Sequence, residues 1–274
     1  MEITILSDNQ SSGNLQAEHG LSILIKHNNQ SILFDTGASD LFIRNAESLG
    51  IRINEVDVLI LSHGHNDHTG GLKYFLENNS KATIYLSSAI TGKKYYSTRN
   101  ELKRDISTDE QLIITNKERF IFIRETTFIS PGIALVCQFE NKYDMPKANS
   151  RLSVSDENGE RPDNFTHEIA LAINTACGIV IFSGCCHNGL PNILDTCASL
   201  YPDKEIIACI GGTHLIDNYE TIPEIEETAR FIKTNYPRLK LYTGHCTGEC
   251  ATVSLKKILE HNFFPFHAGY SITV

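Results

Sequence analysis

Four metal-ligand residues stand within six positions of one loop, in the run LSHGHNDHTGG at residues 61–71. They are His63, His65, Asp67 and His68, and they follow the apolar run VDVLILS, which is typical of a buried strand. A packed core has no use for three imidazoles and a carboxylate in one turn, because each would need a buried polar partner. A metal site therefore explains this loop better than packing or a surface turn does.

The ligand types of this loop indicate which metals suit it. Imidazole nitrogen and carboxylate oxygen are ligands for zinc, manganese or iron. Because Asp67 and His68 are adjacent, they cannot easily point to the same metal as His63 and His65. We therefore predict two divalent metal ions, with zinc as the first choice and manganese or iron as alternatives.

Charge and hydropathy exclude several classes of partner. The formal net charge is -9, and the nearest thing to a basic run, ELKR at residues 101–104, reads as a solvated helix face, so we expect no nucleic-acid binding. No apolar run approaches the length of a membrane span, and the N-terminal residues lack the features of a signal peptide. We predict a soluble, cytoplasmic protein that acts on a small molecule. The oligomeric state cannot be predicted from these features.

Eight cysteines occur in a large chain without an export signal, which favours free thiols over disulfides. Cys185 and Cys186 precede His187 in the run GIVIFSGCCHNGL. These three residues allow four interpretations: metal ligands, a disulfide, a nucleophile with its base, or packing at a strand end. A disulfide between adjacent cysteines is strained, and the loop at residues 61–71 already supplies a nucleophile through its metals, so metal ligation is favoured.

Strand-like and helix-like segments alternate through most of the chain, which predicts an α/β layered architecture in one domain over residues 1–274. Short apolar runs near the N-terminus indicate a hairpin that turns at HNNQ, followed by a helix over residues 38–50. Residues 91–165 are more polar and irregular, and we predict that they form an insertion, either a lid or a surface excursion.

The pattern H-x-H-x-D-H after a hydrophobic strand resembles the metallo-β-lactamase superfamily. Three further runs carry the resemblance along the chain: ILFDTG at 32–37, GIVIFSG at 178–184 and LYTGH at 241–245. The resemblance implies an αββα four-layer sandwich with a two-metal site along one edge. A closer resemblance is to the branch named for dihydropterin–ribofuranosylaminobenzene phosphate synthase, through AEHGLSILI at 17–25, GCCHNG at 184–189, GGTHL at 211–215 and GHCTG at 244–248.

The resemblance implies a role for each matched residue. His63 and His65 would hold one metal, and Asp67 and His68 the other, with His245 as a further ligand. A hydroxide shared by the metals would attack a carbonyl or phosphorus centre. Asp35 would not bind metal itself but would hold a ligand histidine in one tautomer.

The third ligand motif departs from the family pattern, because the usual GHTxG-like turn is missing. His187 and His167 compete for this place, and His187 is favoured. Cys185 stands where the superfamily has a bridging aspartate, and its thiolate could replace that carboxylate as a metal ligand or only support the turn.

Four further residues are candidates for substrate contact or proton transfer. His214 follows two glycines after a strand and is expected to face the substrate or donate a proton, so we group it with Asp67 as catalytic. Glu18, His19 and Thr247 belong to the branch motifs and are candidate substrate contacts, Thr247 through a phosphate.

These features predict a di-metal hydrolase or phospho-transfer enzyme for a small phosphorylated or heterocyclic substrate, pterin-like or nucleotide-like. An iron-dependent redox enzyme, such as a persulfide-oxidising type, is the alternative. A non-catalytic metal-binding protein is the third possibility.

Overall fold

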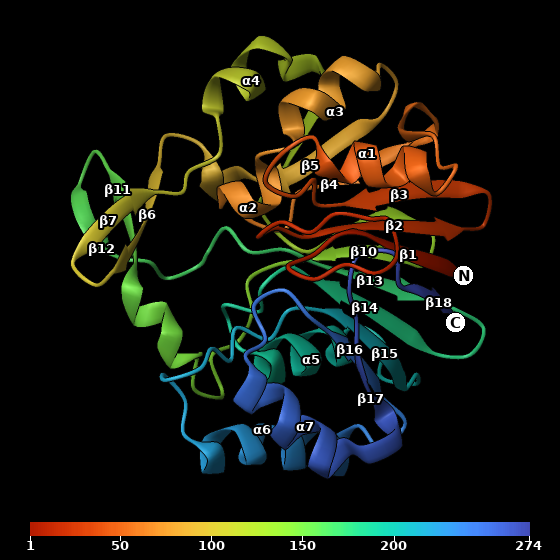
Figure 1. Ribbon diagram of the computed structural model, residues 1–274, viewed down its shortest axis with the longest axis vertical. Helices are drawn as coiled ribbons and strands as arrows, with labels where there is room; N and C mark the ends of the chain where they lie inside the picture. The colour runs from red at the N-terminus through yellow and green to blue at the C-terminus, as the bar shows by residue number, and fades with distance from the viewer. The chain divides into compact units, whose positions relative to one another are not determined.

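Two seven-stranded mixed sheets contain most of the strands of the chain (Figure 1). The computed structural model describes residues 1–274, which divide into two compact units. The first unit comprises residues 1–124, 152–163 and 267–274, and the second comprises residues 125–151 and 164–266. Each unit contains one of the two large sheets and is described by itself. The expectation of a single domain stays a prediction.

The sheet of the first unit has the strand order β18-β1-β2-β3-β4-β5-β8. Neighbours from β18 to β3 are antiparallel, whereas β3, β4, β5 and β8 run parallel. The strands are β1 (Glu2–Ser7), β2 (Ser22–His27), β3 (Gln30–Phe34), β4 (Val58–Ile60), β5 (Thr83–Ser87), β8 (Phe120–Ile123) and β18 (Ser271–Thr273). The predicted hairpin at HNNQ joins β2 to β3, and its central residues Asn28 and Asn29 both have the positive φ that a tight hairpin turn needs.

The helices of the first unit cover the sheet through an apolar core. They are α1 (Leu41–Ser48), α2 (Asn66–Thr69), α3 (Leu72–Asn78) and α4 (Glu110–Thr115), with 3₁₀ turns at Ile53–Glu55, Ser88–Ile90 and Lys117–Arg119. Phe42 of α1 and Phe75 of α3 are fully buried with Leu33 and Leu59 of the sheet. The helix predicted over 38–50 is therefore present, and it ends before Gly50, whose φ of 71° lies in the left-handed region that suits glycine.

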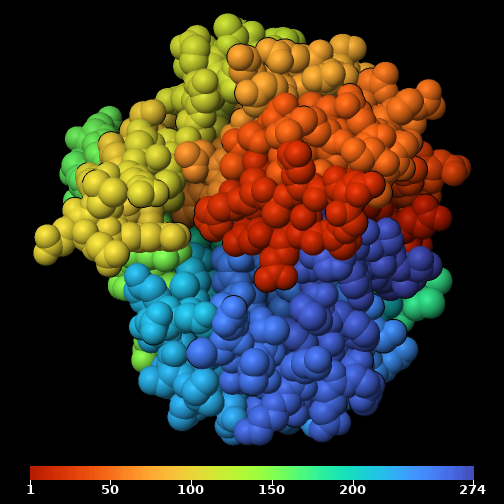
Figure 2. Space-filling view, viewed as in Figure 1, coloured from red at the N-terminus to blue at the C-terminus, as the bar shows by residue number.

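A small four-stranded sheet, in the order β12-β11-β6-β7, also belongs to the first unit. Its strands are β6 (Lys94–Arg99), β7 (Leu102–Asp105), β11 (Leu152–Asp156) and β12 (Gly159–Pro162). Side chains of β7 lie on the surface, as the yellow atoms of Figure 2 show, and Leu102 is more than half exposed, whereas Tyr95 and Ser97 of β6 are buried.

The sheet of the second unit has the order β17-β16-β15-β14-β13-β10-β9, and its strands from β14 to β17 run parallel. The strands are β9 (Thr127–Ser130), β10 (Ile133–Val136), β13 (Ala170–Asn174), β14 (Ile179–Ser183), β15 (Ile206–Gly211), β16 (Lys240–Thr243) and β17 (Phe263–Pro265). The helices are α5 (Leu190–Ser199), α6 (Ile222–Asn235) and α7 (Glu249–Leu259), with 3₁₀ turns at Lys147–Arg151 and Glu260–Asn262. These helices bury Ile193, Ala229 and Leu255 in one core with strand residues such as Ile181.

Much of the segment 91–165 belongs to the two main sheets and does not form the separate insertion predicted from the sequence. Its strand β8 is an edge of the first sheet, and its strands β9 and β10 extend the second sheet. Only β6, β7, β11 and β12 form a separate structure. The apolar runs RFIFIRE and GIALVCQFE thus pair with the main sheets, because the chain passes from one unit to the other within this segment. None of the helices has both the length and the apolar character needed to cross a bilayer.

Candidate metal centre

The carboxyl ends of parallel strands position the candidate ligands of the first unit. β3 ends at Phe34, immediately before Asp35, and β4 ends at Ile60, shortly before His63. Because β3 and β4 are parallel neighbours, their carboxyl ends lie at the same edge of the sheet. The sequence therefore delivers a carboxylate and a histidine-rich loop to one place.

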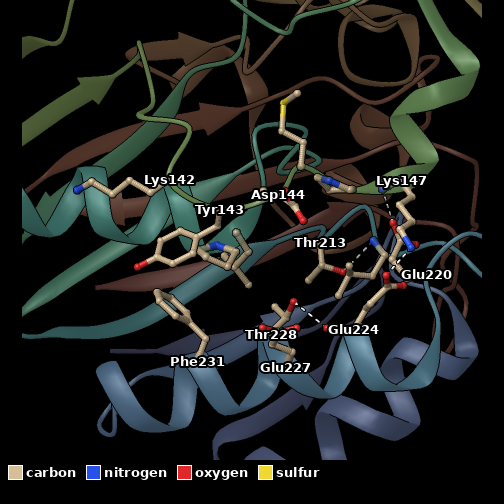
Figure 3. A pocket seen from close by; sticks show the side chains of 16 residues that line it. Lys142, Tyr143, Asp144, Lys147, Thr213, Glu220, Glu224, Glu227, Thr228 and Phe231 are labelled. Carbon is tan, nitrogen blue, oxygen red and sulfur yellow. Dashed lines mark hydrogen bonds and ion pairs between the residues drawn. The ribbon is translucent and has the colours of Figure 1, made fainter.

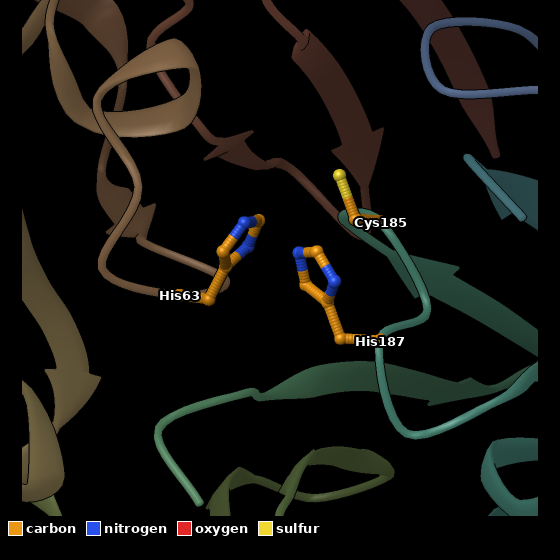
Figure 4. A group of neighbouring side chains, drawn as sticks. All are labelled: His63, Cys185 and His187. Carbon is orange, nitrogen blue, oxygen red and sulfur yellow. The ribbon is translucent and has the colours of Figure 1, made fainter. Parts of the chain in front are cut away.

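The histidine loop gathers its donor atoms closely. His63 and His68 are fully buried, and their ring centroids are 4.1 Å apart, while the ring of His65 lies 4.5 Å from that of His63. One ligand atom from each of His63, Asp67 and His68 lies within 4.8 Å of the others. Figure 4 shows the His63 imidazole on this loop. Two imidazoles and a carboxylate at this spacing suit a divalent metal such as zinc.

Asp35 orients one of these histidines. Its Oδ2 atom lies 2.7 Å from Nδ1 of His68, and it accepts a hydrogen bond of 2.7 Å from the Ser62 hydroxyl. Its Oδ1 atom accepts a hydrogen bond of 2.7 Å from the Ser62 backbone N–H. A carboxylate at Nδ1 places the proton there and leaves Nε2 as the basic atom, which is the arrangement typical of metal-ligating histidines. The role of Asp35 in holding a metal-ligand histidine stays a prediction.

Replacing Asp35 by Ala should weaken metal binding, because His68 would lose the partner that sets its tautomer and ring orientation. We expect the metal affinity to fall by about 10–100-fold. Isothermal titration of metal-free protein with zinc would measure this change. Asp40→Ala is a suitable control, because Asp40 is exposed and pairs only with Arg44 in the same turn of α1. Unchanged affinity in Asp35→Ala would show that Asp35 supports the fold alone.

Asp163 is a candidate that sequence reasoning missed. Its Oδ2 atom lies 3.9 Å from Nε2 of His65, and both side chains are buried. Asp163 follows β12, so the return of residues 152–163 to the first unit brings it to the histidine loop. The surrounding run, RPDNF, carries no motif, and nothing local in the sequence points to this contact.

Glu18 and His19 differ in their surroundings. The carboxylate of Glu18 links two segments of the first unit. Its Oε1 atom accepts hydrogen bonds from the Ser7 hydroxyl and the Ala38 backbone N–H, and its Oε2 atom accepts one from the Ser39 hydroxyl. His19 is exposed, and its Nε2 atom lies 3.4 Å from Oδ2 of Asp67. His19 therefore reaches a proposed ligand, whereas the carboxylate of Glu18 is occupied by these three donors.

Three neighbouring parallel strands position the candidate ligands of the second unit. Ser183 at the end of β14 pairs with Gly211 at the end of β15, and Gly211 pairs with Thr243 at the end of β16. The loops that follow these three strand ends carry Cys185, His187, His214, His245 and Cys246. Figure 4 shows Cys185 and His187 on the loop after β14. Adjacent strands are about 4.8 Å apart, so side chains just beyond their ends meet.

Within this group, Cys185, His214 and Cys246 form a buried cluster. One ligand atom from each lies within 4.8 Å of the others. The His214 backbone N–H donates to Sγ of Cys246 at 3.3 Å, and a Cβ atom on Gly212 would lie only 2.3 Å from that sulfur. Both ring nitrogens of His214 are buried without a hydrogen-bond partner.

The thiols of this region differ in how easily they ionise. Burial opposes ionisation of Cys246, but its contacts with Cys185 and His214 and the charges of His245 and His214 outweigh it, so the pKa of Cys246 lies well below its usual value. Burial raises the pKa of Cys186 well above that of a free thiol, and its side chain packs in the core. All eight cysteines are free thiols, so the Cys185–Cys186 disulfide considered from the sequence is absent.

His187 is held from two sides. Its Nδ1 atom lies 3.0 Å from Oδ1 of Asn149, and its backbone carbonyl accepts a hydrogen bond of 2.7 Å from the Asn149 amide. The ring stacks on Phe165, with centroids 4.5 Å apart. A side-chain partner at Nδ1 directs Nε2 toward a ligand role. His167 is also buried, and its ring is tilted against that of Phe165 with centroids 6.0 Å apart. The preference for His187 over His167 as a ligand stays a prediction.

Sequence comparison places the chain among known proteins. Residues 15–133 match the family model described as the metallo-beta-lactamase superfamily. The chain is 30% identical to 7,8-dihydropterin-6-methyl-4-(beta-D-ribofuranosyl)-aminobenzene-5'-phosphate synthase of Methanocaldococcus jannaschii, over 92% of this chain and 89% of that protein. The chain belongs to the metallo-β-lactamase superfamily. An uncharacterized protein of the same organism is 29% identical over 99% of this chain and 100% of its own length.

A solved structure agrees with this membership. The crystal structure of Tm1679, described as a metal-dependent hydrolase of the beta-lactamase superfamily, is 30% identical and matches with a TM-score of 0.86 over 100% of this chain and 99% of that one. The metallo-β-lactamase fold expected from the sequence is therefore confirmed, with two mixed sheets flanked by helices. The superfamily membership and the His/Cys groups also support the expectation of a metal-dependent enzyme.

Glu168 is a second carboxylate, after Asp163, that the sequence did not indicate. Its Oε1 atom accepts a hydrogen bond of 2.7 Å from the His187 backbone N–H. Its Oε2 atom accepts hydrogen bonds from the backbone N–H and the side-chain amide of Asn188. Burial raises the pKa of Glu168, although these hydrogen bonds act in the opposite direction. Glu168 therefore fixes the backbone of the loop that carries His187.

A cavity of about 400 Å³ lies in the second unit (Figure 3). Gly189 and Thr213, from two of the loops that carry candidate ligands, contribute to its lining. Tyr143 and Phe231 form an aromatic wall, with ring centroids 4.8 Å apart. Lys147 also lines the cavity and is paired with Glu224. Residues 142–147 belong to the segment predicted as an insertion or lid, so part of that segment borders the cavity.

The hydroxyl of Thr247 contacts the hydroxyls of two other threonines of the second unit. The Oγ1 atom lies 2.9 Å from that of Thr213 and 2.6 Å from that of Thr243. These contacts tie the loop after β16 to the loop after β15. The role of Thr247 as a phosphate contact stays a prediction.

Proposed function

We propose that this protein is a metal-dependent hydrolase or phospho-transfer enzyme acting on a small phosphorylated or heterocyclic substrate. The observation that carries the proposal is the Asp35–His68 contact of 2.7 Å beside donor atoms of His63, Asp67 and His68 that lie within 4.8 Å of one another. A carboxylate that orients a buried histidine in this way is typical of a metal site rather than of a packed core.

The ligands we propose are those expected from the family resemblance: His63, His65, Asp67, His68, Cys185, His187 and His245. Bound divalent metals supply Lewis-acid polarisation of a carbonyl or phosphoryl oxygen and lower the pKa of water. The chain itself contributes ligand orientation, through Asp35 at His68 and through Asn149 at His187. Asp67 has its Oδ2 atom 3.8 Å from Nε2 of His68, which suits a ligand that also accepts a proton during the reaction.

The substrate class rests on the cavity and on the relative. The wall formed by Tyr143 and Phe231 provides a surface on which a planar heterocycle can pack. The relative in Methanocaldococcus jannaschii is named for the synthesis of a dihydropterin phosphate, which contains both a heterocycle and a phosphate. We propose a pterin-like or nucleotide-like substrate on these grounds, with no nucleic-acid or membrane partner.

The first test is metal analysis of protein purified without added metal, combined with an assay on a phosphodiester reporter. We expect two zinc or manganese ions per chain and hydrolysis that a chelator abolishes. Iron as the only metal, with oxygen uptake on a persulfide, would overturn the hydrolase and support the redox alternative. Bound metal with neither activity would favour a non-catalytic metal-binding protein.

A further inference from the structure

The second unit contains a group of metal-ligand side chains of which only Cys185 belongs to the ligand set of the proposed hydrolase. His214 is only 3% exposed, and both of its ring nitrogens lack a hydrogen-bond partner. A buried polar group without a partner is costly, so such a group requires a reason.

Two sulfur atoms stand beside this imidazole. Cys185 and Cys246 are both buried free thiols, and their Sγ atoms and one nitrogen of His214 lie within 4.8 Å of one another. In a tetrahedral zinc site, with metal–ligand distances of about 2.0–2.3 Å, ligand atoms lie roughly 3.3–3.8 Å apart. The upper bound of 4.8 Å on the spacing of the cluster is compatible with one metal ion.

The backbone favours this cluster over ordinary packing. His214 has a φ of 51°, in the left-handed region that a β-strand exit does not need. Gly212 leaves the space that Sγ of Cys246 fills, since a Cβ atom there would lie 2.3 Å from that sulfur. A strained backbone is typical of functional sites. The close approach of the Cys246 sulfur to Gly212 is a second sign that these side chains were placed together.

We propose that Cys185, His214 and Cys246 form a thiolate-rich metal site within the second unit, with one open coordination position. Cys185 is already a candidate ligand, and His214 and Cys246 are the new members. Two thiolates and one imidazole favour zinc over magnesium, calcium or manganese. A coordinated His214 holds a metal instead of donating a proton. The site concerns metal retention and does not depend on hydrolysis.

Zinc K-edge X-ray absorption of the wild-type protein, loaded with one zinc per chain, tests the proposal without any substitution. We expect two sulfur ligands at about 2.3 Å. A first shell of nitrogen and oxygen alone, or with a single sulfur, would overturn it. Thiol titration of the metal-free protein gives an independent test, because a Cys185–Cys246 disulfide would lower the count by two and would also overturn it.

Cobalt substitution identifies the ligands. We expect a sulfur-to-cobalt charge-transfer band that falls to about half in Cys246→Ser and in Cys185→Ser, since each variant keeps one of two thiolates. His214→Ala should keep the band but lower the cobalt affinity by about tenfold or more. Cys250→Ser is the control, because Cys250 is exposed and should leave the band unchanged.

One further full-length variant separates this site from the hydrolase centre. His63→Ala combined with His68→Ala removes ligands of the histidine loop. We expect this variant to lose hydrolysis and to keep the charge-transfer band. Loss of the band would show that the second unit does not hold metal by itself and would overturn the proposal. A band with no hydrolysis in the wild type would instead count against the proposed function alone.

Discussion

Asp67→Ala is expected to lower kcat/KM by about 10³-fold, equivalent to about 4 kcal/mol of lost transition-state stabilisation. The variant removes a carboxylate whose Oδ2 atom lies 3.8 Å from Nε2 of His68 and 3.4 Å from Nε2 of His19. Both the charge on the site and a proposed metal ligand are lost. Steady-state kinetics on the phosphodiester reporter, with metal content measured on the same sample, would check this result.

The control for this experiment is Asp57, which lies immediately before β4. Asp57 pairs with the exposed Lys81 at 2.7 Å, and exposed ion pairs contribute little. Asp57→Ala should therefore leave kcat/KM unchanged. If Asp67→Ala retained its metal and its activity, Asp67 would be neither a ligand nor a catalytic residue.

Glu168→Ala is expected to lower the free energy of unfolding by about 3 kcal/mol or more, because three buried donors of His187 and Asn188 would lose a charged acceptor. Urea-induced unfolding followed by circular dichroism would measure this loss. We also expect the loop that carries His187 to loosen, which would lower the metal content of the purified variant.

Two further variants are compared with Glu168→Ala. The first tests whether the side-chain shape and one oxygen acceptor are enough, and the second is a surface control. Glu168→Gln keeps the shape and one oxygen acceptor, and should lose less stability than Glu168→Ala. Glu205→Ala removes a carboxylate that pairs with Arg238 on the surface, and should cost less than about 1 kcal/mol. Equal stability of Glu168→Ala and wild type would show that water replaces the carboxylate without cost.

The part of the site that the sequence predicts is local. His63 to His68 follow a strand within one loop, so strand signals and residue types were enough to single them out, whereas Asp35 was indicated by the family resemblance. The same holds for His187, which lies just beyond a strand whose apolar run is plain in the sequence.

The part that could not be predicted depends on contacts between distant segments. Asp163 reaches His65 only because residues 152–163 return to the first unit. Asn149 reaches His187 across 38 positions, and Glu168 reaches it across 19. An acid or amide before a strand normally faces water, so nothing in the residue type indicates burial. The pairing of β8 and β9 with the main sheets was missed for the same reason.

The left-handed backbone at four site residues has a consequence for engineering. Asp35, Cys186, His214 and His245 have φ values of 62°, 60°, 51° and 51°. Glycine tolerates this region better than these residues do, because it has no Cβ atom. Selection for thermostability alone would therefore favour replacing His214 and His245, and would remove the imidazoles while the fold improved. Stability and activity are set against each other at these positions, so a stabilised variant should be sought elsewhere in the chain.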